Sequence, residues 1–336
     1  MSHSSVRRTS ATLLAFAAAL FLGASTVLAQ TDAAPSAPEA PSAPGAPATL
    51  TFPPADPHNF TADKPTTPEV EAFLKATWGY DPNLAWQVQS IGKTAVPNVS
   101  KVSVAIGQKN NPSQVGALTF FTLPDGQHII SGDEMVPFGA RPFEATRKIL
   151  QAEATGPARG SASKDLMLVE FADFQCPHCK DAQPTIQRLI QDYPNARFVF
   201  ESFPLPQHSE APKAAAYGVC VQKAAGDDAF FKYADAVFTN QANLTPEGSD
   251  QALKDIVTKL GLDPAKIAAC STSPVGVDGV KVSLDLSHKL EVRETPTLYV
   301  NGRALPIGGI QYDQLKQIIS YQAAQDGVTT AAASAQ

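Results

Sequence analysis

The sequence has little basic charge, only one closely spaced cysteine pair and no long apolar run after its first residues. Its formal net charge is −6 at pH 7, and loss of residues 1–29, with Arg7 and Arg8 and no acid, takes it to about −8. An acidic chain is not expected to bind nucleic acid. Four cysteines are present, and a zinc knuckle, which needs two ligand pairs, lacks its second half. No cofactor motif is recognised.

The one apolar run of note lies near the start, in residues 11–22. It holds about 12 residues, whereas a membrane-spanning helix needs about 20, which argues against the alternative of a membrane anchor. Two arginines precede it and the small-residue stretch "STVLA" follows, a pattern typical of a secretory signal peptide cut after Ala29. We therefore expect a periplasmic or secreted protein, in a compartment where disulfides persist.

Composition divides the rest of the chain. Residues 30–66 are rich in alanine and proline ("APSAPEAPSAPGAPA") and predict an extended linker. The end, residues 326–336, predicts a disordered tail. What remains is long enough for two domains, which we place at residues 67–150 and 160–325.

The first domain is predicted to be a small α+β unit. Thr67 is expected to cap a helix with Pro68 in its first turn, and apolar residues then recur on one side. The segments "VSKVSVAI", "VGALTFFTL" and "QHIISGDEM" are rich in strand formers, and "PDG" between the last two is a turn signal. An antiparallel sheet with a helix is the economical prediction.

The second domain carries the motif "FQCPHCK" at residues 174–180. The apolar run "DLMLVEFADF" before it predicts a buried strand, and a helical pattern follows Pro177. Cys176 is therefore expected at a helix N-terminus, where free amide groups and the helix dipole stabilise a thiolate, and a protonated His178 would add to this. Cys179, one turn further on, should be shielded. We expect an exposed, acidic nucleophile at Cys176 and a buried partner at Cys179.

A pair of cysteines at this spacing can also serve as a haem attachment site or as a structural crosslink. A covalent haem site needs histidine directly after the second cysteine, where this chain has Lys180. A purely structural crosslink across three residues closes almost no loop and would stabilise little. Redox chemistry is the favoured interpretation.

Several separated motifs resemble the thioredoxin superfamily, and within it the DsbA-like thiol:disulfide oxidoreductases of the Thioredoxin_4 type. They are "VEFADFQCPHC", "FPLPQHSEAPKAAAYGVC", "FFKYADAVFTNQ" and "VRETPTLYVNGRAL", in this order. The resemblance implies an α/β thioredoxin fold with a helical insertion, here over about residues 209–290, behind the small α+β domain.

The same resemblance implies further site residues. Thr295 and Pro296 would form a loop with a cis peptide bond that faces the cysteines and pairs with an extended substrate, although a simple turn is the alternative. Glu170 matches a buried acid beneath the site, whose neutral form is favoured by apolar surroundings and which could relay a proton to Cys179. Its alternative is an ordinary ion pair with a lysine.

Cys220 and Cys270 remain once the local pair is assigned. A bridge between them closes a loop of about 50 residues and would stabilise the fold by about 4 kcal/mol in the chain-entropy model. We expect a structural disulfide. A second redox pair that relays electrons from the first is the alternative.

Function follows from the direction of electron flow. Stabilising the thiolate of Cys176 stabilises the reduced protein, so its disulfide becomes a stronger oxidant, and Pro177–His178 resembles the oxidising branch. We expect an oxidase that gives its disulfide to unfolded exported proteins with cysteines and is reoxidised by a quinone-linked membrane partner, DsbB-like or VKOR-like.

Two other functions stay open at this stage. The first domain weakly resembles the dimerisation module of DsbC/DsbG-type isomerases through "GALTFFTLPDGQHIISGDEM", which would make the protein a homodimeric isomerase or reductase. From another class, a periplasmic peptide-binding chaperone would use the cysteines only as an accessory.

Overall fold

The structure is a computed structural model that describes residues 49–330 and divides into two compact units between Pro142 and Phe143. The predicted signal peptide and the linker up to residue 48 lie outside the described residues, as do residues 331–336. No helix within the described part is long and apolar enough to cross a membrane.

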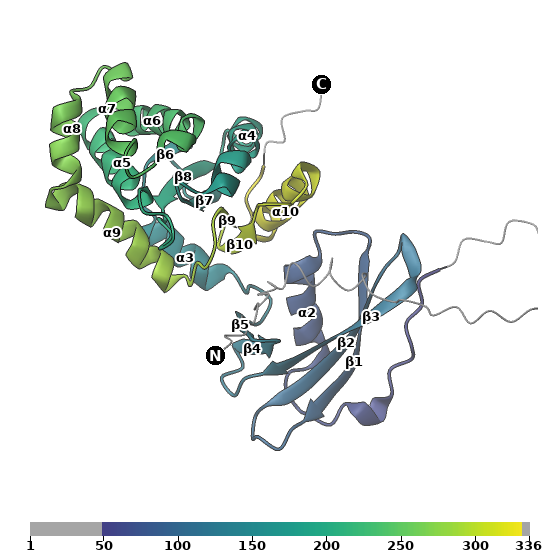
Figure 1. The fold of residues 1–336 in the computed structure, drawn as a ribbon. Coiled ribbons are helices and arrows are strands. Elements are labelled where there is room, and N and C mark those ends of the chain that lie inside the picture. The colour runs from purple at the N-terminus through teal and green to yellow at the C-terminus, as the bar shows by residue number, and fades with distance from the viewer. Residues whose placement is uncertain (1–48, 331–336) are drawn as a thin grey trace, which may run out of the picture. The chain divides into compact units, whose positions relative to one another are not determined.

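The first unit is an antiparallel sheet with one helix packed on it (Figure 1). Its strands follow each other in chain order: β1 (Leu84–Lys93), β2 (Ser100–Gln108), β3 (Asn111–Thr122), β4 (His128–Ser131) and β5 (Glu134–Pro137). Helix α2 (Thr67–Trp78) follows the short 3-10 helix η1 (Pro57–Asn59). Phe73 of α2 meets Phe120 of β3 in the core, with ring centroids 6.0 Å apart. This is the predicted α+β unit.

Two details of the first unit differ from the predictions. The helix is capped one residue earlier, because the hydroxyl of Thr66, rather than that of Thr67, accepts from the N–H of Glu69. Residues 49–66 were predicted to be linker, but in the structure they belong to the first unit. The N–H groups of Thr61 and Ala62, for example, both donate to the carbonyl oxygen of Ile91. Backbone pairing of this kind holds even a proline-rich segment against a strand.

The domain boundary near residue 150 is also wrong. Helix α3 (Glu144–Glu153) belongs to the second unit, because its Leu150 is buried in one cluster with Val169 and Phe171 of the central strand. The apolar contacts of α3 decide which unit it belongs to, and the sequence of an amphipathic helix does not show which core the helix covers.

The second unit is built on a mixed sheet in the order β10-β9-β7-β8-β6. Its strands are β6 (Ala158–Gly160), β7 (Met167–Ala172), β8 (Arg197–Ser202), β9 (Thr297–Val300) and β10 (Arg303–Pro306). Strands β7 and β8 run parallel, while β9 is antiparallel to β7. Every residue of β7 is buried, as its apolar run predicts for a strand covered on both faces. Helices α4 (Pro177–Asp192) and α10 (Tyr312–Gln325) complete the thioredoxin-like core.

Between β8 and β9 lies the predicted helical insertion, drawn mostly in green in Figure 1. It comprises α5 (Ala211–Ala225), α6 (Asp227–Thr239), η2 (Gln241–Asn243), α7 (Ser249–Lys259), α8 (Pro264–Ser271) and α9 (Pro274–Lys289). A disulfide joins Cys220 of α5 to Cys270 of α8, which confirms the predicted pairing. The expected fold class, a thioredoxin fold with a helical insertion behind a small α+β domain, is confirmed.

The chain makes specific contacts beyond residue 325, where a tail was predicted. A carboxylate oxygen of Asp326 accepts from the amides of Asn301 and Gln322, and Asn195 donates to the carbonyl oxygen of Thr329. The described part of the predicted tail is therefore attached to the second unit, because a carboxylate and a carbonyl within it accept hydrogen bonds from that unit.

Candidate active site

The cysteine pair lies at the connection between β7 and α4, at the N-terminus of the helix. Cys176 is the N-cap residue of α4, with extended backbone angles (φ −72°, ψ 119°), and its carbonyl oxygen accepts from the N–H groups of Cys179 and Lys180. Pro177 occupies the first turn, where a missing N–H costs nothing. Both cysteines are free thiols. The strand-to-helix placement is as predicted.

One expectation about Cys176 is wrong. It was predicted to be exposed, yet the residue is only 4% exposed, and Cys179 is 0% exposed. The loop of Thr295 explains the difference, because Cys176 Sγ lies 3.6 Å from the carbonyl oxygen of Thr295, to which the thiol donates. Segments 119 residues apart meet here, which local sequence does not reveal. The exposed residues of the motif are Pro177, His178 and Lys180.

The pKa values of the two thiols are shifted in opposite directions. The pKa of Cys176 is lowered to about 5, first by a hydrogen bond from the thiol of Cys179 and then by hydrogen bonds with Thr295 and from the N–H groups of Cys179 and His178, while burial opposes the shift. The pKa of Cys179 is raised, mainly by burial and then by its hydrogen bond to Cys176. The N–H groups of His178 and Cys179 among these donors belong to the first turn of α4, so the free amides at the helix start take part in the shift, as predicted.

The loop opposite the cysteines contains the predicted cis peptide bond, between Thr295 and Pro296. Both residues are buried, and strand β9 begins directly after them, at Thr297. The carbonyl of Thr295 is therefore held against the reactive sulfur by the sheet itself. A simple solvent-exposed turn, the alternative interpretation, does not describe this loop.

Glu170 lies on β7 beneath the site and is 0% exposed. Its Oε1 accepts from Nε2 of Gln183 at 3.2 Å, and the same nitrogen donates to the carbonyl oxygen of Cys179 at 3.0 Å. Within residues 49–330 the other carboxyl oxygen has no hydrogen-bond partner. Burial raises the pKa of Glu170 to about 8, against the opposing effects of Gln183 and Arg159. The structure thus joins this acid to the turn of Cys179 through an amide, and the lysine pair of the alternative interpretation is not what holds it.

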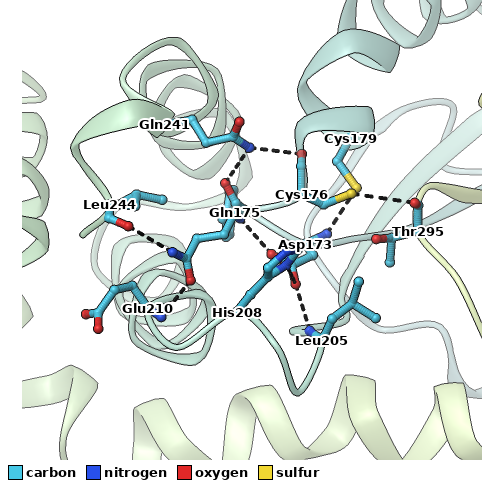
Figure 2. Close-up of polar contacts among 11 residues, drawn as sticks. Asp173, Gln175, Cys176, Cys179, Leu205, His208, Glu210, Gln241, Leu244 and Thr295 are labelled. Atoms are coloured by element: carbon cyan, nitrogen blue, oxygen red, sulfur yellow. Dashed lines mark hydrogen bonds and ion pairs between the residues drawn. The ribbon is translucent and has the colours of Figure 1, made fainter. Parts of the chain in front are cut away.

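Sequence reasoning missed a polar framework that holds the catalytic loop (Figure 2). The amide nitrogen of Gln241 donates to the carbonyl oxygens of Phe174 and Cys176, both at 2.9 Å. Gln175 donates to the carbonyl oxygen of Leu244 at 2.8 Å and accepts from the N–H of Glu210. The sequence offers little signal for these contacts, since Gln241 lies in the polar stretch "TNQANLT".

An aromatic cluster anchors the same loop from its apolar side. The ring of Phe174 stacks on Phe200 of β8 at 5.4 Å between centroids and packs edge-on against Tyr233 of α6 at 5.8 Å. Such ring pairs add to the free energy of burial. The helical insertion therefore fixes the residue two positions before Cys176 through both apolar and polar contacts.

Part of the chain is similar to known proteins. The family model Thioredoxin_4, described as thioredoxin, matches residues 152–321. The disulfide bond formation protein D of Bacillus subtilis is 25% identical over 169 residues, which cover 48% of this chain and 75% of that protein. The Na(+)/H(+) antiporter NhaA 3 of Salinispora tropica is 31% identical over 146 residues, or 43% of this chain. The chain covers only about a fifth of the length of that antiporter.

Solved structures are also similar to part of this chain. Oxidised BdbD from Bacillus subtilis is 23% identical, with 50% of this chain and 93% of that chain covered and a TM-score of 0.46. The catalytic domain of Proteus mirabilis ScsC is 25% identical, with 53% and 98% covered and a TM-score of 0.44.

Proposed function

The chain belongs to the thioredoxin family, in a DsbA-like form with a helical insertion, and we propose that it is an exported thiol:disulfide oxidoreductase that introduces disulfides into other proteins. The observation that carries this proposal is the placement of two free thiols in one motif, with Cys176 at the N-cap of α4 and its sulfur 3.6 Å from the carbonyl oxygen of Thr295, and with Cys179 buried behind it. In this geometry the pKa of Cys176 is lowered to about 5 and that of Cys179 is raised. A thiolate stabilised in the reduced protein makes the corresponding disulfide a stronger oxidant.

The exchange proceeds in two balanced steps. A substrate thiolate attacks Sγ of Cys176 in the 176–179 disulfide, that bond breaks, and Cys179 leaves as a thiolate that then takes up a proton. A second substrate thiolate attacks the substrate sulfur of the mixed disulfide, and Cys176 leaves as a stabilised thiolate. The substrate loses two electrons, and the 176–179 disulfide gains them and becomes a dithiol.

The neighbouring residues have distinct parts in this scheme. We assign to the backbone of Thr295, whose carbonyl oxygen faces Sγ of Cys176, the pairing with an extended peptide during the mixed disulfide. To Glu170, neutral below about pH 8, we assign the exchange of a proton with Cys179. Gln183 holds this acid beside the backbone of Cys179, since its Nε2 donates to Oε1 of Glu170 and to the carbonyl oxygen of Cys179.

An oxidising location is part of the proposal. Residues 1–29 have the pattern of a cleaved signal peptide, and the Cys220–Cys270 disulfide is a type of crosslink that persists outside the cytoplasm. We propose periplasmic or secreted clients with unpaired cysteines, and a quinone-linked membrane protein that accepts the electrons and restores the disulfide.

The experiment that tests this function uses the oxidised protein and reduced, unfolded ribonuclease A. We expect two ribonuclease thiols to disappear for each 176–179 disulfide reduced, and a Cys176→Ala variant to consume none. A protein that leaves those thiols intact, yet restores activity to scrambled ribonuclease when reduced, would instead be an isomerase. A Cys176→Ala variant that still suppressed aggregation at full strength while the wild type oxidised nothing would favour a chaperone.

A further inference from the structure

The turn between β7 and α4 contains a buried acid that has no part in the two exchange steps described above. Asp173 is 1% exposed. Its Oδ1 accepts from the N–H of Gln175 at 2.6 Å, and its Oδ2 accepts from the N–H of Leu205 at 2.7 Å and from Nδ1 of His208 at 2.8 Å (Figure 2). Three hydrogen bonds to one buried carboxylate hold its side chain in a single position.

The backbone of the same residue faces the second cysteine. The amide nitrogen of Asp173 lies 3.4 Å from Sγ of Cys179 and donates to it. Burial raises the pKa of Cys179, as does its hydrogen bond to Cys176, whereas this N–H acts in the opposite sense and favours the thiolate. Because carboxylate and N–H belong to one residue, whatever holds the carboxylate also aims the N–H at the sulfur.

His208 is the side chain that holds this carboxylate from the distant segment after β8. Among the described residues, the other two donors to Asp173 are backbone groups, so the imidazole is the one removable donor. The His208 side chain is 21% exposed, compared with 0% for that of Asp173. A change at His208 therefore removes one hydrogen bond without opening the core.

We propose that His208 is a positioning residue of the exchange reaction, acting through Asp173 on the leaving sulfur of Cys179. This inference rests on the proposed function. When a substrate thiolate forms a bond to Cys176 Sγ, the bond between Cys176 and Cys179 breaks and its electron pair goes to Cys179 Sγ. The Asp173 N–H donates to that sulfur as its charge develops, and the thiolate later takes a proton from its surroundings. A leaving thiol that is better stabilised leaves faster.

A purely structural role would look different. If His208 only secured the loop of residues 203–210, its loss would lower the melting temperature without a specific effect on the bond-breaking step. The step can be isolated, because the rate at which a dithiol peptide attacks the oxidised protein depends on Cys179 as leaving group. The pKa of Cys176, whose hydrogen bonds come from other groups, serves as an internal reference.

The test compares four full-length variants with the wild type. His208→Phe keeps a ring and removes the donor, His208→Ala removes both, and His208→Asn places an amide nitrogen where the ring Nδ1 lies. His288→Ala, at an exposed position on α9, is the matched control. Attack of a dithiol peptide on each oxidised protein is stopped with acid at set times and followed by mass spectrometry.

We expect His208→Phe and His208→Ala to react about three- to tenfold more slowly, the upper limit being 1.36 kcal/mol in the barrier. His208→Asn and His288→Ala should stay within about twofold of the wild type, and the Cys176 pKa should be the same in all five proteins. Wild-type rates in both donor-free variants, or equal slowing in His208→Asn, would overturn the inference. If His208→Phe or His208→Ala fails to fold, the rate of the other variant tests the inference. A wild type that oxidises no peptide overturns the proposed function itself, which is a separate result.

Discussion

Glu170 and Cys179 share one hydrogen-bond donor, Nε2 of Gln183, which lies 3.2 Å from the carboxyl oxygen of the first and 3.0 Å from the carbonyl oxygen of the second. The buried acid is thus connected to the backbone of the second cysteine. Its neutral form is favoured, since burial raises its pKa to about 8.

A Glu170→Gln variant should be more stable than the wild type at neutral pH. Between the unfolded pKa of about 4.3 and the folded pKa of about 8, the unfolded chain has lost the proton and the native protein keeps it, so the native state of the wild type loses stability as pH rises. The difference should reach about 4 kcal/mol at pH 7 and stop growing above pH 8. Urea unfolding of both oxidised proteins measures it.

The pH profile is the control for that prediction. At pH 4 the carboxyl is protonated in both states, so the advantage of Glu170→Gln should be small there. An advantage that is equally large at pH 4 and pH 7 would show that packing, rather than ionisation, separates the two proteins.

The thiol of Cys179 is the largest cause of the low Cys176 pKa. In reduced Cys179→Ala, which lacks this donor, the pKa of Cys176 should therefore rise by at least about one unit. Cys179→Ser keeps a donor at the same place and should retain most of the shift. Thiolate absorbance near 240 nm follows both titrations, and identical values in the two variants would assign the shift to the backbone N–H groups and Thr295 instead.

The Cys220–Cys270 disulfide should contribute stability and not electron transfer. Replacing both cysteines with alanine is expected to lower the free energy of unfolding by about 4 kcal/mol in the chain-entropy model, since 50 residues separate them. The initial rate of substrate oxidation should be unchanged. A loss of turnover in a variant that remains folded would support the alternative of a second redox pair.

The reduction potential should lie on the oxidising side of the family's range. Because the thiolate of Cys176 stabilises the reduced protein, we expect a value above about −200 mV, compared with about −270 mV for thioredoxin. Equilibration with glutathione buffers measures it, with the redox state read by alkylation of Cys176 and Cys179. A potential near that of thioredoxin would favour a reductase.

What could be predicted from the sequence was local. An apolar run with one acid, Glu170, inside it identified β7 as a strand buried on both faces, and the helical pattern after Pro177 placed Cys176 at a helix start. The disulfide followed once the CPHC pair had been assigned. The cis bond before Pro296 came from resemblance and not from any local pattern.

What could not be predicted depends on the way the fold brings distant segments together. His208 reaches Asp173 across 35 residues, and Gln241 reaches Cys176 across 65. A single polar residue in a loop has many available partners, so its sequence neighbours do not identify the right one. The burial of Cys176 was missed for the same reason, because the group that covers it belongs to Thr295.

The acidity of one sulfur supports the whole account, and a titration of the reduced wild-type protein tests it most directly. Absorbance near 240 nm, corrected with Cys176→Ala, should report a thiolate that forms with a midpoint near pH 5. A midpoint near 8.5, the value of an ordinary thiol, would contradict the proposed role of Cys176.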